Sequence, residues 1–185
     1  MRSLGFLAAV LILVGSANAQ QVAPNRGQPT AGGSPSLPKP FAAVLPEVKA
    51  RSRIPVLLPG EISKAIAGAG YPFVDKATEN EYAILLYFKP GIGDAGFAAS
   101  FAGQAHPGYE PQELPNVRKV KLSDGIIGYF RPVSCGGSCA PANVWWKEHR
   151  VLYQVQAMLS PATSENDQQQ AITAIADSAI LAGPR

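Results

Sequence analysis

Apolar residues in this chain recur mainly in short runs that alternate with polar residues, a pattern typical of β-strands. Residues 147–150, Lys-Glu-His-Arg, separate two of these runs and predict a hairpin turn. A further run, residues 54–58, contains Pro55, which has no backbone N–H to donate, so we expect it at the edge of a sheet. The other strands are predicted at residues 82–88, 97–101, 117–122, 126–130, 144–146 and 151–157.

Two segments have helical spacing instead. In residues 62–69 apolar side chains recur every three or four positions and predict a short N-terminal helix of two turns. A longer helix is expected to begin after Ser164, a favourable N-cap, and to end at Gly183. The apolar face of this helix consists of Ile172, Ile175, Ala176, Ala179 and Ile180. Strands followed by a helix predict the α+β class, as an antiparallel sheet of several strands packed by a C-terminal α-helix.

The N-terminal residues 1–19 have the three parts of a secretory signal peptide. Arg2 gives a positive start, residues 4–14 are apolar, and Ala17-Asn18-Ala19 places small residues where a signal peptidase cuts. The alternative is a membrane anchor, but the apolar run is about 11 residues and a spanning helix needs about 20. We therefore expect an exported protein, periplasmic or extracellular, without stable membrane insertion after cleavage.

Composition divides the rest of the chain into two parts. Residues 20–40 are rich in Pro and Gly and nearly lack large apolar side chains, which predicts a disordered linker. Residues 41–182 are expected to form a single α+β domain. Only 16% of the 185 residues are charged and the net charge is +3, which excludes a coiled coil and gives no strong field for nucleic acid.

Cys135 and Cys139 are the two cysteines of the chain. An oxidising compartment favours a disulfide, and Gly136-Gly137 between them lets the backbone turn sharply. Two thiols without a nearby histidine or second cysteine pair cannot complete a zinc site, and the spacing is not that of a thioredoxin-like motif. A structural disulfide is therefore predicted, and no metal site.

The order of three motifs resembles a group of small bacterial exported domains of unknown function. The motifs are Pro55-Val56-Leu57-Leu58-Pro59, the segment from Trp146 to Tyr153, and Ile175-Ala176-Asp177-Ser178. Such domains are antiparallel sheets with a helix and occur in extracytoplasmic parts of regulatory and envelope proteins. The resemblance implies a fold and a compartment, and it carries over no catalytic residue.

Gly91-Ile92-Gly93-Asp94-Ala95-Gly96 has the spacing of a dinucleotide-binding loop. That loop requires a helix directly afterwards, whereas the following residues, 97–101, have a strand pattern. We therefore interpret this segment as a turn between strands and predict no cofactor. Gly137-Ser138 lacks the final glycine of a nucleophile elbow, because position 140 is Ala.

A loop rich in proline contains the residues of the one enzymatic alternative. His106, Glu110 and Glu113 could together form the shallow site of a small secreted hydrolase. This alternative requires that they converge in a pocket with shifted pKa values. Solvated loop charge explains the same residues without catalysis, and no metal-ligand spacing includes His106 or His149. We therefore predict no catalytic residue.

Trp145 and Trp146 indicate a binding function, since neighbouring residues of a strand face opposite sides of a sheet. An exposed indole near Tyr129 or Tyr153 could stack on a sugar or anchor a partner protein. In the alternative, a helix covers one indole and a loop covers the other. The resulting hypothesis is a non-catalytic exported protein that binds an envelope protein or polymer, with these four residues as ligand-binding candidates.

Besides Lys49, Arg51 and Arg53, the chain has one compact basic cluster, Arg118, Lys119 and Lys121 on a predicted strand. A strand face of this kind can contact phosphate or an anionic glycan. More often such a cluster is a solvated strand face or an edge that discourages pairing with other chains, and we favour this interpretation.

Overall fold

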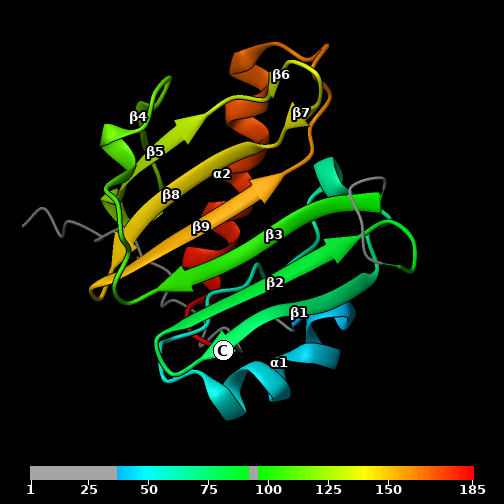
Figure 1. Cartoon of the computed structure of the whole chain (residues 1–185), viewed down its shortest axis with the longest axis vertical. Coiled ribbons are helices and arrows are strands. Elements are labelled where there is room, and N and C mark those ends of the chain that lie inside the picture. The colour runs from blue at the N-terminus through cyan, green and yellow to red at the C-terminus, as the bar shows by residue number, and fades with distance from the viewer. Residues whose placement is uncertain (1–36, 92–95) are drawn as a thin grey trace, which may run out of the picture. The chain divides into compact units, whose positions relative to one another are not determined.

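An antiparallel sheet of seven strands forms the centre of the fold (Figure 1). The computed structural model describes residues 37–91 and 96–185, so the predicted signal peptide and residues 20–36 of the predicted linker lie outside the described residues. The strand order is β1-β2-β3-β9-β8-β5-β4. The strands are β1 (Tyr71–Thr78), β2 (Glu81–Tyr87), β3 (Phe97–Gln104), β4 (Arg118–Lys121), β5 (Ile127–Arg131), β8 (Ala142–Glu148) and β9 (Val151–Ala157).

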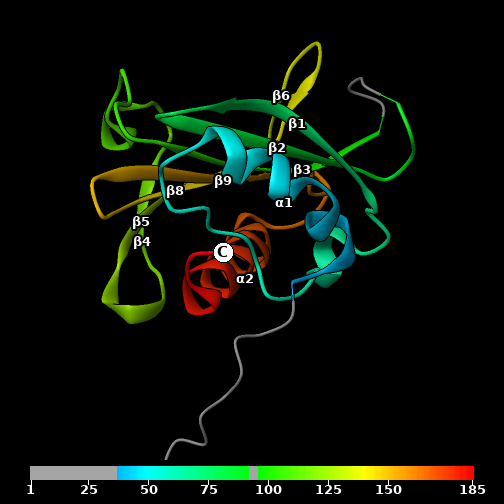
Figure 2. The ribbon, with the colours of Figure 1, turned by 90° about the horizontal axis from the view of Figure 1, so that it is seen from below.

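Two α-helices, α1 (Lys39–Arg51) and α2 (Glu165–Ala182), lie on the same side of this sheet (Figure 2). The core fills the space between the helices and the sheet. We call this side of the sheet the helix face and the other side the open face. The predicted α+β class, the antiparallel sheet and the C-terminal helix are confirmed, and a short helix does precede the strands.

Strand register aligns apolar side chains in rows across the helix face. One row joins Tyr82, Gly103, Tyr153, Trp146 and Gly128 through consecutive pairs of antiparallel neighbours. Gly103 leaves room for the Tyr82 and Tyr153 rings, and Gly128 leaves room for the Leu122 side chain. The strands β2, β3, β5, β8 and β9 therefore contribute alternate residues to the helix face.

Gly103 is expected to tolerate no larger side chain. A Cβ atom at this position would lie 2.7 Å from Cε1 of Tyr82 and 3.2 Å from Cδ1 of Tyr153, and both rings are buried. We expect Gly103→Ala to lower the free energy of unfolding by about 1–3 kcal/mol, the usual cost of overpacking. Urea denaturation measures this effect, and Gly108→Ala, with no atom within 4 Å of its new Cβ, is the control. Equal stabilities of the two variants would contradict the packing argument.

Helix α2 begins and ends where the sequence predicts. The Ser164 hydroxyl accepts a hydrogen bond from the backbone N–H of Asp167, and Gly183 has a φ of 68° at the C-cap. The buried Gln168 side chain accepts from the Val133 backbone N–H at 2.9 Å, which ties the helix to the chain after β5. These contacts fix α2 against the half of the sheet that contains β8 and β9.

Three local predictions differ from the structure. Residues 54–58 do not form a strand; they cross the helix face, where Leu57 forms a single antiparallel bridge with Pro184. The segment 62–69 contains only the 3₁₀ turn Lys64–Ile66, and the early helix is α1, which begins at Lys39, inside the predicted linker. Strand β1 was not predicted, because it is an edge strand with Pro72 and little apolar alternation.

The turns between neighbouring strands follow the sequence more closely. β8 and β9 are joined by a two-residue turn in which His149 and Arg150 have positive φ angles of 50° and 65°, as in a type I′ hairpin. The segment Gly91–Gly96 connects the antiparallel neighbours β2 and β3, but its residues 92–95 lie outside the described residues. The predicted turn at this segment therefore stays a prediction.

The predicted disulfide joins Cys135 to Cys139. These residues belong to a separate two-stranded hairpin of β6 (Ser134–Cys135) and β7 (Cys139–Ala140). All residues of the hairpin are exposed, so the bond closes a surface loop and does not staple the core.

Candidate functional site

The two tryptophans of β8 point to opposite faces of the sheet, and both are only 1% exposed. Trp146 lies in the core of the helix face, where its ring stacks on Tyr153 with centroids 5.5 Å apart. Trp145 lies on the open face, where its indole N–H donates to the Tyr109 hydroxyl at 3.2 Å. The expectation of an exposed indole is therefore wrong. The helix side covers one ring and the loop that contains Tyr109 covers the other.

This loop, residues 105–117, is attached to the open face at a second point. The Lys147 ammonium lies 2.5 and 2.6 Å from the two carboxylate oxygens of Glu110. The 3₁₀ turn Pro111–Glu113 follows directly. The structure therefore has the second arrangement that the sequence allows, in which a helix covers one indole and a loop covers the other.

Of the four predicted ligand-binding residues, Tyr129 is the most accessible. Tyr153 is buried, its hydroxyl donates to the Pro55 carbonyl at 3.0 Å, and burial together with the charge of Glu148 raises its pKa. Tyr129 on β5 is half-buried and lines a hollow of about 320 Å³ beside the loop. Its companions there are Glu110, Gln112, Ile127, Lys147 and Leu152.

Three cationic side chains surround Tyr129 on the open face. Lys119 on β4 is its direct cross-strand neighbour, and Lys121 is two residues further along β4 on the same face. Arg131 is two residues beyond Tyr129 on β5, and its guanidinium carbon lies 5.2 Å from the centroid of the Trp145 ring. We call Lys119, Lys121, Tyr129 and Arg131 the basic–aromatic surface.

The charges of this surface are not neutralised within the described part of the chain. Salt bridges there involve other cations, and none includes Lys119, Lys121 or Arg131. A cation–π contact holds the Arg131 side chain over an indole that is itself fixed by the loop. The result is a guanidinium that lies over an indole and whose hydrogen-bond donors have no protein acceptor among the described residues.

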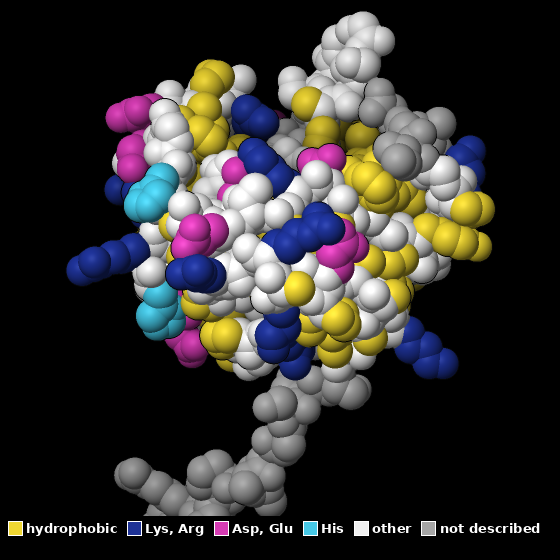
Figure 3. All heavy atoms as spheres, turned by 60° about the horizontal axis from the view of Figure 1, so that its bottom comes forward, with side chains coloured by type: hydrophobic (Ala, Val, Ile, Leu, Met, Phe, Trp, Pro, Cys, Tyr) yellow, Lys and Arg dark blue, Asp and Glu magenta, His cyan; other side chains and the backbone are white. Residues whose placement is uncertain are grey.

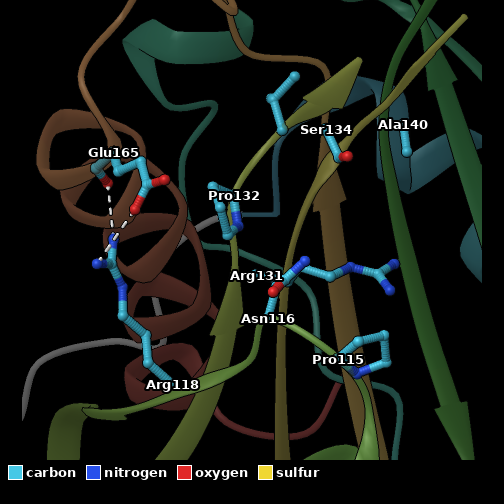
Figure 4. Close-up of a pocket in the computed structure, with 9 residues that line it drawn as sticks. Pro115, Asn116, Arg118, Arg131, Pro132, Ser134, Ala140 and Glu165 are labelled. Carbon is cyan, nitrogen blue, oxygen red and sulfur yellow. Dashed lines mark hydrogen bonds and ion pairs between the residues drawn. The ribbon is translucent and has the colours of Figure 1, made fainter. Parts of the chain in front are cut away.

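Arg118 does not belong to this surface, although the sequence groups it with Lys119 and Lys121. Its side chain is on the helix face, where the guanidinium lies 5.0 Å from the Phe130 ring centroid and 3.3 Å from a carboxylate oxygen of Glu165. Figure 4 shows Arg118 directed at Glu165 while Arg131 extends the other way. A hollow of about 690 Å³ that both arginines line therefore does not bring their charges together.

The structure gives the hydrolase alternative no support. His106 and Glu113 are exposed, and no hydrogen bond or ion pair within the described residues joins His106 to Glu110 or Glu113. The hydrogen bond from Lys147 lowers the pKa of Glu110, whereas a general acid requires a raised one. In the described residues, no group of three or more His, Cys, Asp or Glu side chains is placed to hold a metal ion.

The Glu110–Lys147 pair is expected to make loop attachment dependent on pH. Since the pKa of Glu110 is lowered in the folded state, its contribution to stability is complete above the unfolded value of about 4.3 and is lost as the pH falls through the lowered value. Glu110→Gln is expected to have a slightly lower Tm than the native chain at pH 7 and the same Tm near pH 3. A Tm difference that stays constant between these pH values would contradict this role.

Basic side chains form no broad field on the face viewed in Figure 3. Lys and Arg are dispersed there and lie beside Asp and Glu. In addition, none of the described helices is long and apolar enough to cross a membrane.

Comparisons with protein-family profiles, with curated proteins and with solved structures find no match to this chain. The site must therefore be interpreted from its own geometry. Sequence reasoning found Tyr129 and the β4 lysines but missed Tyr109 and Arg131. The signal for Arg131 was present, because it continues the period-two face of Ile127 and Tyr129 one residue beyond the predicted end of that strand.

Proposed function

We propose that this protein is an exported, non-catalytic binding protein of the bacterial cell envelope and that the basic–aromatic surface is its binding site. The observation that carries this proposal is the Arg131 guanidinium, which lies over the Trp145 ring without an acidic partner in the described residues. Such an arrangement favours recognition of an external acceptor group, because the donors are already positioned and little side-chain entropy is lost on binding.

Export is supported by the signal-peptide pattern of residues 1–19 and by the Cys135–Cys139 disulfide, which is typical of oxidising compartments. Expression of the full chain in a bacterium, followed by fractionation and N-terminal sequencing, tests this part. We expect a mature protein that begins at Gln20 in the periplasm or the medium. An uncleaved chain confined to the cytoplasm would contradict it.

Binding is tested by a thermal-shift screen of the mature protein against envelope components. The panel contains peptidoglycan fragments, neutral and acidic polysaccharides, lipids and envelope protein extracts. A ligand at one hundred times its Kd adds about 2.7 kcal/mol of stability, which for a domain of this size raises the Tm by roughly 5–10 °C. Cross-linking in intact cells is the matched measurement for a protein partner. A flat panel together with no cross-linked species would overturn the proposed function.

A further inference from the structure

We propose that the ligand of the basic–aromatic surface is an acidic polysaccharide that carries carboxylates on successive sugars. This inference rests on the proposed function and specifies the ligand class of the same site.

Arg131 provides the most specific part of the surface. A guanidinium presents a planar fork of N–H donors that matches the two oxygens of a carboxylate. The Trp145 ring lies 5.2 Å from the guanidinium carbon, and the ring is held by its hydrogen bond to Tyr109. The guanidinium therefore lies over the indole, and its N–H donors, which have no acceptor among the described residues, are left for an incoming anion.

The lysines of β4 extend the positive charge along a line. Lys119 and Lys121 project from the same face of one strand, roughly 6.6 Å apart at the usual rise of a β-strand. β4 is the last strand of the sheet that the described residues form, so none of their other strands limits access from that side. A row of separate cations suits a polymer with repeated anionic groups better than a single small anion.

Tyr129 favours a sugar as the unit between the anions. It lies between Lys119 on β4 and Trp145 on β8 and is half-buried, so part of its ring is accessible beside the cations. An aromatic ring with a polar hydroxyl offers an apolar surface for a sugar and a hydrogen bond at its edge. Nucleic acid is a poorer fit, because the net charge is only +3 and basic side chains are dispersed on the face viewed in Figure 3.

The test uses the full mature protein and affinity electrophoresis in gels that contain alginate, a polymer of uronic acids, with dextran as the neutral reference and polyphosphate as the phosphate reference. We expect retardation by alginate that decreases with salt, and none by dextran. The double variant Arg131→Gln, Lys119→Gln should bind alginate about 10-fold more weakly or worse, because it loses hydrogen bonds from charged donors. Arg131→Lys keeps the positive charge but removes the planar fork of donors, so it should lose part of the affinity for alginate.

Lys39→Gln combined with Lys49→Gln is the matched control, because it also removes two positive charges, and both lysines are exposed on α1 and form no salt bridge with the described residues. We expect its affinity to remain within about twofold of the native protein, as for a distant surface charge. Equal weakening in this control would overturn the assignment, since binding would then reflect net charge alone. Circular dichroism of each variant verifies that the fold is retained.

Other outcomes separate the ligand class from the proposed function. Tighter binding of polyphosphate than of alginate would overturn the carboxylate assignment. Binding of dextran or another envelope component without binding of alginate would overturn the acidic polysaccharide and leave an envelope-binding protein. Absence of binding to every component tested, together with no cross-linked partner, would overturn both.

Discussion

Replacing Trp146 by alanine is expected to lower the free energy of unfolding by about 3–5 kcal/mol, the cost of removing a buried aromatic ring from a core. The ring is 1% exposed, belongs to the main core cluster and stacks on Tyr153. Its neighbour Gly128 has no side chain to fill the space that would be left. Urea denaturation monitored by circular dichroism measures the change.

Trp146→Phe separates ring packing from hydrogen bonding. The indole nitrogen of Trp146 is buried and has no hydrogen-bond partner in the described residues, so phenylalanine removes an unsatisfied donor while it keeps an aromatic ring. We expect the destabilisation to be less than half that of Trp146→Ala. If the alanine variant cost less than about 1 kcal/mol, the ring would not be part of a close-packed core.

This position also shows what strand patterns can predict. Residues 144–146 were predicted as a strand, and opposite orientations of Trp145 and Trp146 follow directly from its pleat. The pleat does not determine what covers each side. Trp145 is covered by the loop that contains Tyr109, 36 residues earlier in the chain, whose hydroxyl accepts the indole hydrogen bond. The sequence around Tyr109 has no pattern that predicts this contact.

Strands were predicted well where register places alternate residues in the core. In β9, for example, Val151, Tyr153, Val155 and Ala157 are all buried on the helix face. The prediction failed for residues 54–58, because a run of buried apolar residues is equally consistent with a segment that crosses a core. There the Leu57 backbone N–H is satisfied by the Tyr82 hydroxyl at 3.0 Å and not by a neighbouring strand.

The candidate site was predictable in its parts and not in their combination. Lys119 and Tyr129 come from different predicted strands, and only the register of β4 against β5 makes them neighbours. The same register places Arg118 opposite Phe130, on the helix face, which removes it from the basic cluster. On the open face, Arg131 therefore takes the place of Arg118 beside the two lysines of β4.

The sequence patterns placed the early helix at residues 62–69 and did not predict helix α1 at Lys39–Arg51. The composition of α1 explains why. It has no side-chain hydrogen bond at the N-cap, and Pro46 inside the helix removes one backbone donor. Local propensity therefore contributes little to its stability. Its attachment to the sheet depends on its two buried residues, Phe41 and Val48.

Phe41→Ala is accordingly expected to release α1 from the sheet. The Phe41 ring is fully buried and meets Phe101 of β3 edge to face, with centroids 5.0 Å apart. We expect a loss of about 3–5 kcal/mol in the free energy of unfolding, the usual range for Phe→Ala in a core. Hydrogen exchange should show a further effect: amides of α1 lose protection while those of β3 and β9 keep theirs, because a helix with an internal proline is not stable without its docking contacts.

Lys49→Ala is the matched control in the same helix, since Lys49 is exposed and its replacement is expected to change stability by no more than about 0.5 kcal/mol. Protected α1 amides in the Phe41→Ala variant would show that the helix is held by other contacts, such as those of Val44 and Leu45 with the core. Uniform loss of protection over helix and sheet would show instead that α1 and the sheet unfold as one cooperative unit.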